Sequence, residues 1–164
     1  MEFNDKEVSV KDVGINNDVV KELQKRLMLF FTGETREASD VLEEQKSNVS
    51  NNTVTLEQLK RHAREAVNAL VSGNLDRIGS LLEQTWAYKR ELARNISNDG
   101  IDSLYKRARE AGALGGKITG AGGGGFLLLY VPSDKQDSVR KELSDLIELP
   151  FSFEPKGSRV IYES

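Results

Sequence analysis

Residues 115–125 read Gly115-Gly116-Lys117-Ile118-Thr119-Gly120-Ala121-Gly122-Gly123-Gly124-Gly125, and they run directly into Phe126-Leu127-Leu128-Leu129-Tyr130-Val131. The first run holds seven of the fourteen glycines in the chain. Glycine loses more backbone freedom on folding than any other residue. Such a cluster therefore indicates positive φ angles, or a close approach by another group with no Cβ in the way. The second run is continuous, apolar and bounded by Pro132, which predicts a buried strand.

The glycine loop has two interpretations that composition alone does not separate. Its free N–H groups form a concave site for an anion, or it is a tight hairpin that packs beneath another element. The Walker A pattern fails, because Ile118 stands where Ser or Thr is required and Ala111 where the first Gly is required. The letters of a dinucleotide fingerprint occur at 120–125, but they lead into a strand rather than a helix.

The composition predicts one globular domain. The chain has 164 residues, of which 38% are hydrophobic and 30% charged. It has no apolar run near the roughly 18 residues of a membrane helix and no secretory signal at its start. The absence of cysteine excludes disulfides and zinc–thiolate sites, and a net charge of −3 disfavours nucleic-acid binding. We therefore expect a cytoplasmic protein that binds neither nucleic acid nor membrane.

Hydrophobic periodicity predicts a mixture of strands and helices. Strands are expected at 1–10, 27–31, immediately before the glycine loop, 126–131, 149–154 and 159–163. Helices are expected at about 34–46, 55–72, 75–93, 99–112 and 132–147. Trp86 falls on an inward stripe and Ile147 on the inward face of the last helix, so both are expected in the core. His62 lies among charged residues, which predicts an exposed position.

With the inserted helices set aside, this order is the split β-α-β-β-α-β pattern of ferredoxin-like domains, an α+β fold. Residues 1–10 are too short to be stable alone and resemble the end of a sheet whose other strands lie upstream. We therefore expect residues 1–10 to be a remnant of a preceding N-terminal domain and residues 11–164 to form the domain itself.

Residues 117–126 resemble the third motif of the GHMP kinases, a family that includes galactokinase, homoserine kinase and mevalonate kinase. The order of helix, Gly-Gly-Lys strand, glycine loop and apolar strand is similar to the C-terminal domain of that family. Within the family, residues 29–39 and Leu42-Glu43-Glu44-Gln45 resemble the kinases of D-glycero-D-manno-heptose 7-phosphate and the fucokinase-type enzymes.

The resemblance implies the C-terminal half of an ATP-dependent sugar kinase. In this family ATP and Mg²⁺ are bound mainly by an N-terminal domain with a Pro-x-x-x-Gly-Leu-Gly-Ser-Ser-Ala loop and usually the catalytic Asp. This sequence has no such loop. The chain is therefore expected to carry no catalytic residue and no metal ligand, and to be inactive alone. Its partners would be ATP, a sugar or sugar phosphate, and the N-terminal kinase domain, and a homodimer stays open.

The resemblance also assigns site residues. The glycine loop is expected to lie beside phosphate through Gly120, Ala121, Gly122, Gly123 and Gly124. The substrate candidates are Thr32, Arg36, Lys117 and Thr119.

Each substrate candidate has a second interpretation. Arg36 opposes the dipole of the helix it begins, which favours a contact with a sugar phosphate, but a solvated arginine explains it equally. Thr32 faces substrate or, as we prefer, caps the helix. Lys117 reaches an acidic group or points to solvent, and Thr119 is a site hydroxyl or a half-buried strand residue.

Two functions of other classes stay open. The chain is a stand-alone ferredoxin-like module that binds or senses a small anion, or it is a purely structural or dimerising domain. A kinase would carry the Gly-Leu-Gly-Ser-Ser loop upstream in the same reading frame, whereas a stand-alone module would not.

Overall fold

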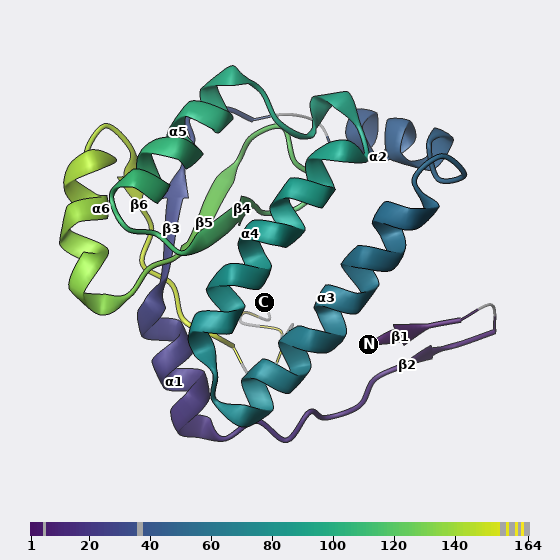
Figure 1. Ribbon diagram of the computed structural model, residues 1–164, viewed down its shortest axis with the longest axis horizontal. Helices are drawn as coiled ribbons and strands as arrows, with labels where there is room; N and C mark the ends of the chain where they lie inside the picture. Colours follow the sequence, from purple (N-terminus) through teal and green to yellow (C-terminus); the bar gives the residue numbers. More distant parts are fainter. Residues whose placement is uncertain (5, 36–37, 155–156, 158–159, 161, 163–164) are drawn as a thin grey trace.

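The computed structural model (Figure 1) describes the chain except for residues 5, 36–37, 155–156, 158–159, 161 and 163–164. The helices are α1 Asn17–Arg26, α2 Ala38–Ser47, α3 Thr53–Ser72, α4 Leu75–Glu91, α5 Asp99–Glu110 and α6 Gln136–Glu142, with short 3₁₀ turns η1 Arg94–Ile96 and η2 Ser133–Lys135. The strands are β1 Glu2–Phe3, β2 Val8–Ser9, β3 Leu27–Phe31, β4 Gly115–Ile118, β5 Phe126–Tyr130 and β6 Ile147–Glu148.

Four strands form one antiparallel sheet in the order β4-β5-β3-β6. The two apolar runs form its centre, and they pair from Leu27 with Tyr130 to Phe31 with Phe126. Alternate residues of β3 are fully buried, namely Met28 and Phe30, and the others are half-buried. This alternation is typical of a sheet with one face in the core.

The connectivity confirms the predicted α+β, ferredoxin-like arrangement. β3, α5, β4, β5, α6 and β6 follow one another as a split β-α-β-β-α-β unit, and α2, α3 and α4 are inserted between β3 and α5. α5 and α6 lie on one side of the sheet (Figure 1), and Ile101 and Val139 from these helices join Leu127 from β5 in the main core. Trp86, from α4, joins the same core at 1% exposure, as predicted.

α3 and α4 run side by side, and α4 packs along β4 (Figure 1). Glycine permits this close approach. A Cβ on Gly115 would lie 2.0 Å from the carbonyl oxygen of Gly79 in α4, and a Cβ on Gly116 would lie 2.5 Å from the carbonyl oxygen of Leu128. Because both neighbours are backbone atoms, any side chain here would push the helix or strand away. These two glycines therefore serve packing.

β1 and β2 pair with each other as a hairpin that forms its own two-stranded sheet. The predicted strand character of residues 1–10 is therefore confirmed at Glu2–Phe3 and Val8–Ser9. Their assignment to a preceding domain stays a prediction. α1 was not predicted from the sequence. Its polar residues leave no side chain buried, but Asn16 caps it by accepting a hydrogen bond from the Asp18 N–H at 2.8 Å.

Two predicted boundaries near the ends of helices are wrong. Residues 34–35 are not helical, although the first helix was expected from residue 34, and α2 is described from Ala38. α6 ends at Glu142 instead of near residue 147. Ile147 belongs to β6 and is 67% exposed, because pairing with Phe31 and the Arg140–Glu148 ion pair (2.8 Å) hold this segment at the sheet edge. The strand predicted at 149–154 is not formed. The strand predicted at 159–163 falls largely outside the described residues.

His62 is buried at 4% exposure, so the prediction of an exposed histidine is wrong. It faces α4, where its Nδ1 lies 3.2 Å from Oγ1 of Thr85 and its ring packs 5.5 Å from that of Tyr88. Burial lowers the pKa of His62, so its neutral form is favoured. The charged neighbours in sequence occupy other faces of α3, which explains the error.

Candidate functional site

The glycine loop, residues 119–125, joins β4 to β5 and adopts an unusual backbone. The φ angle is positive at each of its glycines: 70° at Gly120, 114° at Gly122, 78° at Gly123, 152° at Gly124 and 89° at Gly125. Residues with a Cβ rarely adopt such angles, and those at Gly122 and Gly124 lie outside even the left-handed helical region. The backbone conformation alone therefore requires much of the glycine cluster.

Two segments distant in sequence anchor the second half of the loop. Gly123 donates its N–H to the carbonyl of Ile96 at 2.8 Å, and Gly125 donates to the carbonyl of Glu34 at 2.7 Å. A Cβ on Gly122 would lie 2.9 Å from the Ile96 carbonyl oxygen, and one on Gly124 would lie 2.8 Å from the Glu34 carbonyl oxygen. For this half of the loop, the packing interpretation of the glycines is correct.

The first half of the loop is open. A Cβ on Gly120 would meet no atom within 4 Å. Within the part of the chain that the structure describes, the N–H groups of Gly120 and Ala121 in this half, and those of Gly122 and Gly124 in the packed half, donate to no protein acceptor. Unpaired backbone donors need water or a ligand. The anion interpretation therefore survives for these four amides, whereas the Gly123 amide is already used by the protein. That the loop binds phosphate stays a prediction.

Thr32 holds the loop in place. Its backbone N–H and its hydroxyl both donate to the carbonyl of Gly125, at 2.9 and 3.0 Å. The predicted role as a helix cap is wrong, because Glu34 and Thr35, which follow Thr32, are not helical. On the other side of the loop, Asn98 donates to the Glu34 carboxylate at 2.8 Å and caps α5 by accepting from the Ile101 N–H at 2.8 Å. The side chain of Asn98 therefore ties the start of α5 to the segment that anchors the loop.

The other substrate candidates occupy different places. Lys117 lies on β4, opposite Leu128 of β5, and is half-buried. Burial lowers its pKa. Thr119 begins the loop, where its N–H donates to the carbonyl of Phe126 at 2.9 Å and its side chain is half-buried. Arg36 lies outside the described residues. The structure therefore brings Lys117, Thr119 and Thr32 to the ends of the glycine loop.

Lys89, in the last turn of α4, is a site residue that the sequence analysis missed. Its ammonium group donates a hydrogen bond to the carbonyl of Gly120. Burial, together with the positive charge of Lys117, lowers the pKa of Lys89 to about 8. A signal was available, because Lys89 falls three residues after the inward-facing Trp86 and therefore on an adjoining face of the helix.

The described residues contain no group of three or more His, Asp or Glu side chains arranged to hold a metal ion. The carboxylate of Glu34, whose backbone carbonyl accepts from Gly125 of the loop, is already hydrogen-bonded to Asn98. Among the described helices, none is both long and apolar enough to cross a membrane.

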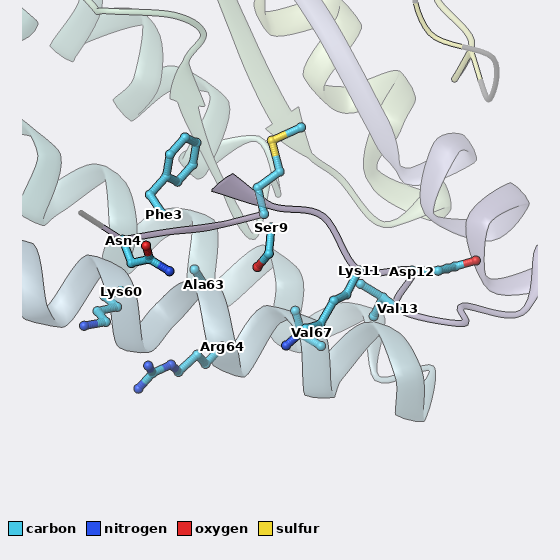
Figure 2. A pocket seen from close by; sticks show the side chains of 11 residues that line it. Phe3, Asn4, Ser9, Lys11, Asp12, Val13, Lys60, Ala63, Arg64 and Val67 are labelled. Atoms are coloured by element: carbon cyan, nitrogen blue, oxygen red, sulfur yellow. The ribbon is translucent and has the colours of Figure 1, made fainter. Parts of the chain in front are cut away.

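A large cavity of about 970 Å³ lies away from the glycine loop, between the N-terminal hairpin and α3. Figure 2 shows Phe3 and Ser9 of the hairpin segment above Ala63 and Val67 of α3. Phe3 is 75% exposed and the strands of the hairpin are two residues long. The walls bring together no set of groups suited to one reaction, so we place the candidate site at the loop.

A family model described as "GHMP kinases C terminal" matches residues 63–148, which is more than half of the chain. The chain belongs to the GHMP kinase C-terminal family. The matched region runs from α3 to β6 and includes the glycine loop, Lys89 and Lys117. The resemblance inferred from residues 117–126 is confirmed.

Individual GHMP kinases agree with this assignment. The D-glycero-alpha-D-manno-heptose 7-phosphate kinase of Campylobacter jejuni is 34% identical over 146 residues, which cover 87% of this chain and 43% of that protein. The structure of a putative sugar kinase from Campylobacter jejuni superimposes with a TM-score of 0.61 at 29% identity, over 93% of this chain and 44% of that one. The mevalonate kinase of Methanococcus jannaschii, with a TM-score of 0.67 at 22% identity over 82% of this chain and 42% of its own, supports the fold alone. The chain thus spans less than half the length of each of these relatives.

Proposed function

We propose that this chain is the C-terminal part of an ATP-dependent sugar kinase whose glycine loop lines the site of phosphoryl transfer. The observation that carries the proposal is the loop itself, which holds four unpaired N–H groups with two lysines beside it. Family membership and the likeness to a heptose 7-phosphate kinase over 87% of the chain support the same function. By that likeness, the favoured substrate is D-glycero-D-manno-heptose 7-phosphate.

The chemistry of phosphoryl transfer fits a divided site. Catalysis of this reaction is mostly positioning and electrostatic stabilisation of the charge on the transferring group. The chain supplies hydrogen-bond donors and positive charge. The reaction also needs ligands for Mg²⁺ and a group that orients the attacking hydroxyl. Among the described residues no three His, Asp or Glu side chains are grouped to hold a metal ion, and the Glu34 carboxylate is hydrogen-bonded to Asn98. We expect those groups to come from an N-terminal kinase domain, which would hold ATP and Mg²⁺ against this loop.

The decisive experiment expresses this chain together with whatever the preceding reading frame encodes. It then measures ATP-dependent phosphorylation by the purified protein. Heptose 7-phosphate, galactose and mevalonate are offered separately, and we expect the heptose phosphate to have the highest kcat/KM. No turnover with any of them would refute the kinase proposal. A preceding sequence without a Gly-Leu-Gly-Ser-Ser-type loop would favour the stand-alone anion-binding module.

The matched variant for this assay is Gly120→Ala. Gly120 has open space on its Cβ side, so the added methyl group meets no protein atom and would instead obstruct a ligand that approaches the loop. We expect a kcat/KM for ATP or sugar at least about tenfold lower, equivalent to about 1.4 kcal/mol, with the fold retained. Unchanged kinetics would show that the first half of the loop is not part of the active site.

A further inference from the structure

Among the described residues, two lysines beside the glycine loop lack the carboxylate partner that several partly exposed arginines have. Six arginines with side-chain exposures of 27–44% each form an ion pair with a carboxylate: Arg26, Arg77, Arg90, Arg107, Arg109 and Arg140. Lys89 and Lys117 are also half-buried, yet no carboxylate of the described residues lies within ion-pair distance of either.

The two lysines come from different elements and meet at the loop. Lys89 lies in the last turn of α4, and its ammonium group donates a hydrogen bond to the carbonyl of Gly120. Lys117 lies three residues before Gly120, on β4, close enough for its charge to act on Lys89. Burial lowers the pKa of both side chains. Two like charges thus lie close together in a partly dehydrated region, and no carboxylate of the described residues forms an ion pair with either one. Such an arrangement destabilises the folded protein.

A bound anion would offset the positive charges of these two lysines. We propose that Lys89 and Lys117, together with the unpaired N–H groups of Gly120 and Ala121, bind the dianionic oxygens of a phosphate monoester. This inference rests on the proposed kinase function for the identity of the natural ligand. Phosphate binding by the lysines is testable without that function.

The chemistry favours phosphate over a carboxylate. Two ammonium groups offset the two negative charges of a phosphate monoester. Lysine and glycine-loop N–H groups together form a common phosphate-binding combination. The phosphate could belong to the sugar substrate or to the nucleotide, and both present the same terminal oxygens. The lysines would then fix the phosphorylated end of a ligand against the loop.

The first test titrates the ¹⁵N-labelled 164-residue chain with inorganic phosphate and follows its amide NMR signals. We expect saturable shifts at Gly120 and Ala121. Lys89→Met and Lys117→Met should each weaken phosphate binding by about tenfold, and Lys89→Arg should restore most of it. Lys21→Met is the matched control, because Lys21 is 74% exposed and lies on α1. It should leave the affinity unchanged.

A purely structural role for Lys89, tying α4 to the loop through the Gly120 carbonyl, predicts different results. It predicts that Lys89→Met loses stability without phosphate and that Lys117→Met binds phosphate as the wild type does. Lys117 makes no hydrogen bond to the loop in the described structure, so its variant decides between the two roles. Wild-type phosphate affinity in Lys117→Met, or no saturable shift in the wild type, would overturn the inference.

Two further titrations identify the source of the phosphate. Glucose 6-phosphate is compared with glucose, and ADP with adenosine. Lysine-dependent binding of the sugar phosphate assigns the site to the substrate, and lysine-dependent binding of ADP assigns it to the nucleotide. Kinase activity without lysine-dependent phosphate binding would overturn this inference alone. Lysine-dependent phosphate binding in a protein that phosphorylates no sugar would overturn the proposed function alone.

Discussion

Replacing Gly122 or Gly120 by alanine should have different effects. The first change should reduce the stability of the protein, and the second should mainly reduce ligand binding. At Gly122, φ is 114° and the new Cβ would lie 2.9 Å from both Cγ2 and the carbonyl oxygen of Ile96, and 3.0 Å from its Cα. Ile96 is fully buried and its carbonyl accepts the Gly123 N–H, so it has little freedom to move. At Gly120, φ is 70° and the Cβ would meet nothing within 4 Å.

The two variants should therefore lose different amounts of stability. For Gly122→Ala, backbone strain costs about 1–3 kcal/mol and overpacking of the core about 1–3 kcal/mol more. We therefore expect a loss of about 4 kcal/mol in the free energy of unfolding. In a domain of this size that lowers Tm by roughly 8–16 °C. For Gly120→Ala, only the left-handed conformation is strained, at about 1 kcal/mol, which lowers Tm by roughly 2–4 °C.

The assay is thermal unfolding of the two variants and the wild type followed by circular dichroism, with urea unfolding to obtain the free energies. A phosphate titration of the same samples gives the second readout, in which Gly120→Ala should bind weakly although it remains folded. Equal losses of stability in the two variants would refute the separation of packing glycines from site glycines. So would a Gly122→Ala protein whose Tm lies within about 2 °C of the wild type.

Three further predictions concern charge, packing and activity. The folded-state pKa of Lys89 lies below its unfolded value, so the unfolded chain retains this proton to higher pH. Urea unfolding should therefore show stability rising from pH 8 to 10 by more in the wild type than in Lys89→Met, and equal slopes would contradict this. Tyr130→Phe removes a buried hydroxyl that accepts from Arg26 at 3.0 Å and donates to Asp76 at 3.1 Å, which should cost about 1 kcal/mol in urea unfolding, whereas a stabilised variant would refute the role of this hydroxyl. The 164-residue chain alone should phosphorylate neither heptose 7-phosphate nor galactose nor mevalonate, and turnover at about 1–100 s⁻¹ would show that it holds a complete active site.

The elements that the sequence predicted best are those in which local and global preferences agree. Residues 27–31 form an apolar run that ends before Thr32-Gly33, and residues 126–130 lie between Gly125 and Pro132. These two runs form the two central strands. α1 was missed because it buries none of its side chains, and its polar composition does not separate a surface helix from a loop. Ile147 was misplaced because its apolar spacing fits a helix, whereas pairing with Phe31 holds it in a strand.

The site was harder to predict because its parts come together only in three dimensions. The glycine loop was evident in the sequence. The residues that anchor it, Ile96 and Glu34, act through their backbone carbonyls, which accept hydrogen bonds from the loop. The pattern of side chains in a sequence does not show which backbone carbonyls will accept hydrogen bonds from a distant loop. The spacing of Lys89 from Trp86 placed it beside the inward face of its helix, but only the packing of α4 along β4 brings it to Gly120.

The division of the glycine loop into an anchored half and an open half bears on how it would bind an anion. The Ile96 and Glu34 carbonyls accept hydrogen bonds from Gly123 and Gly125, and Thr32, which follows β3, holds the same end of the loop. The open amides therefore belong to a segment whose conformation is already set, and a ligand would not have to order it. Donors fixed before the charge arrives stabilise that charge without reorganisation. The anchors should accordingly matter for anion affinity although they do not touch the anion, because loosening either one would let the open half of the loop change shape.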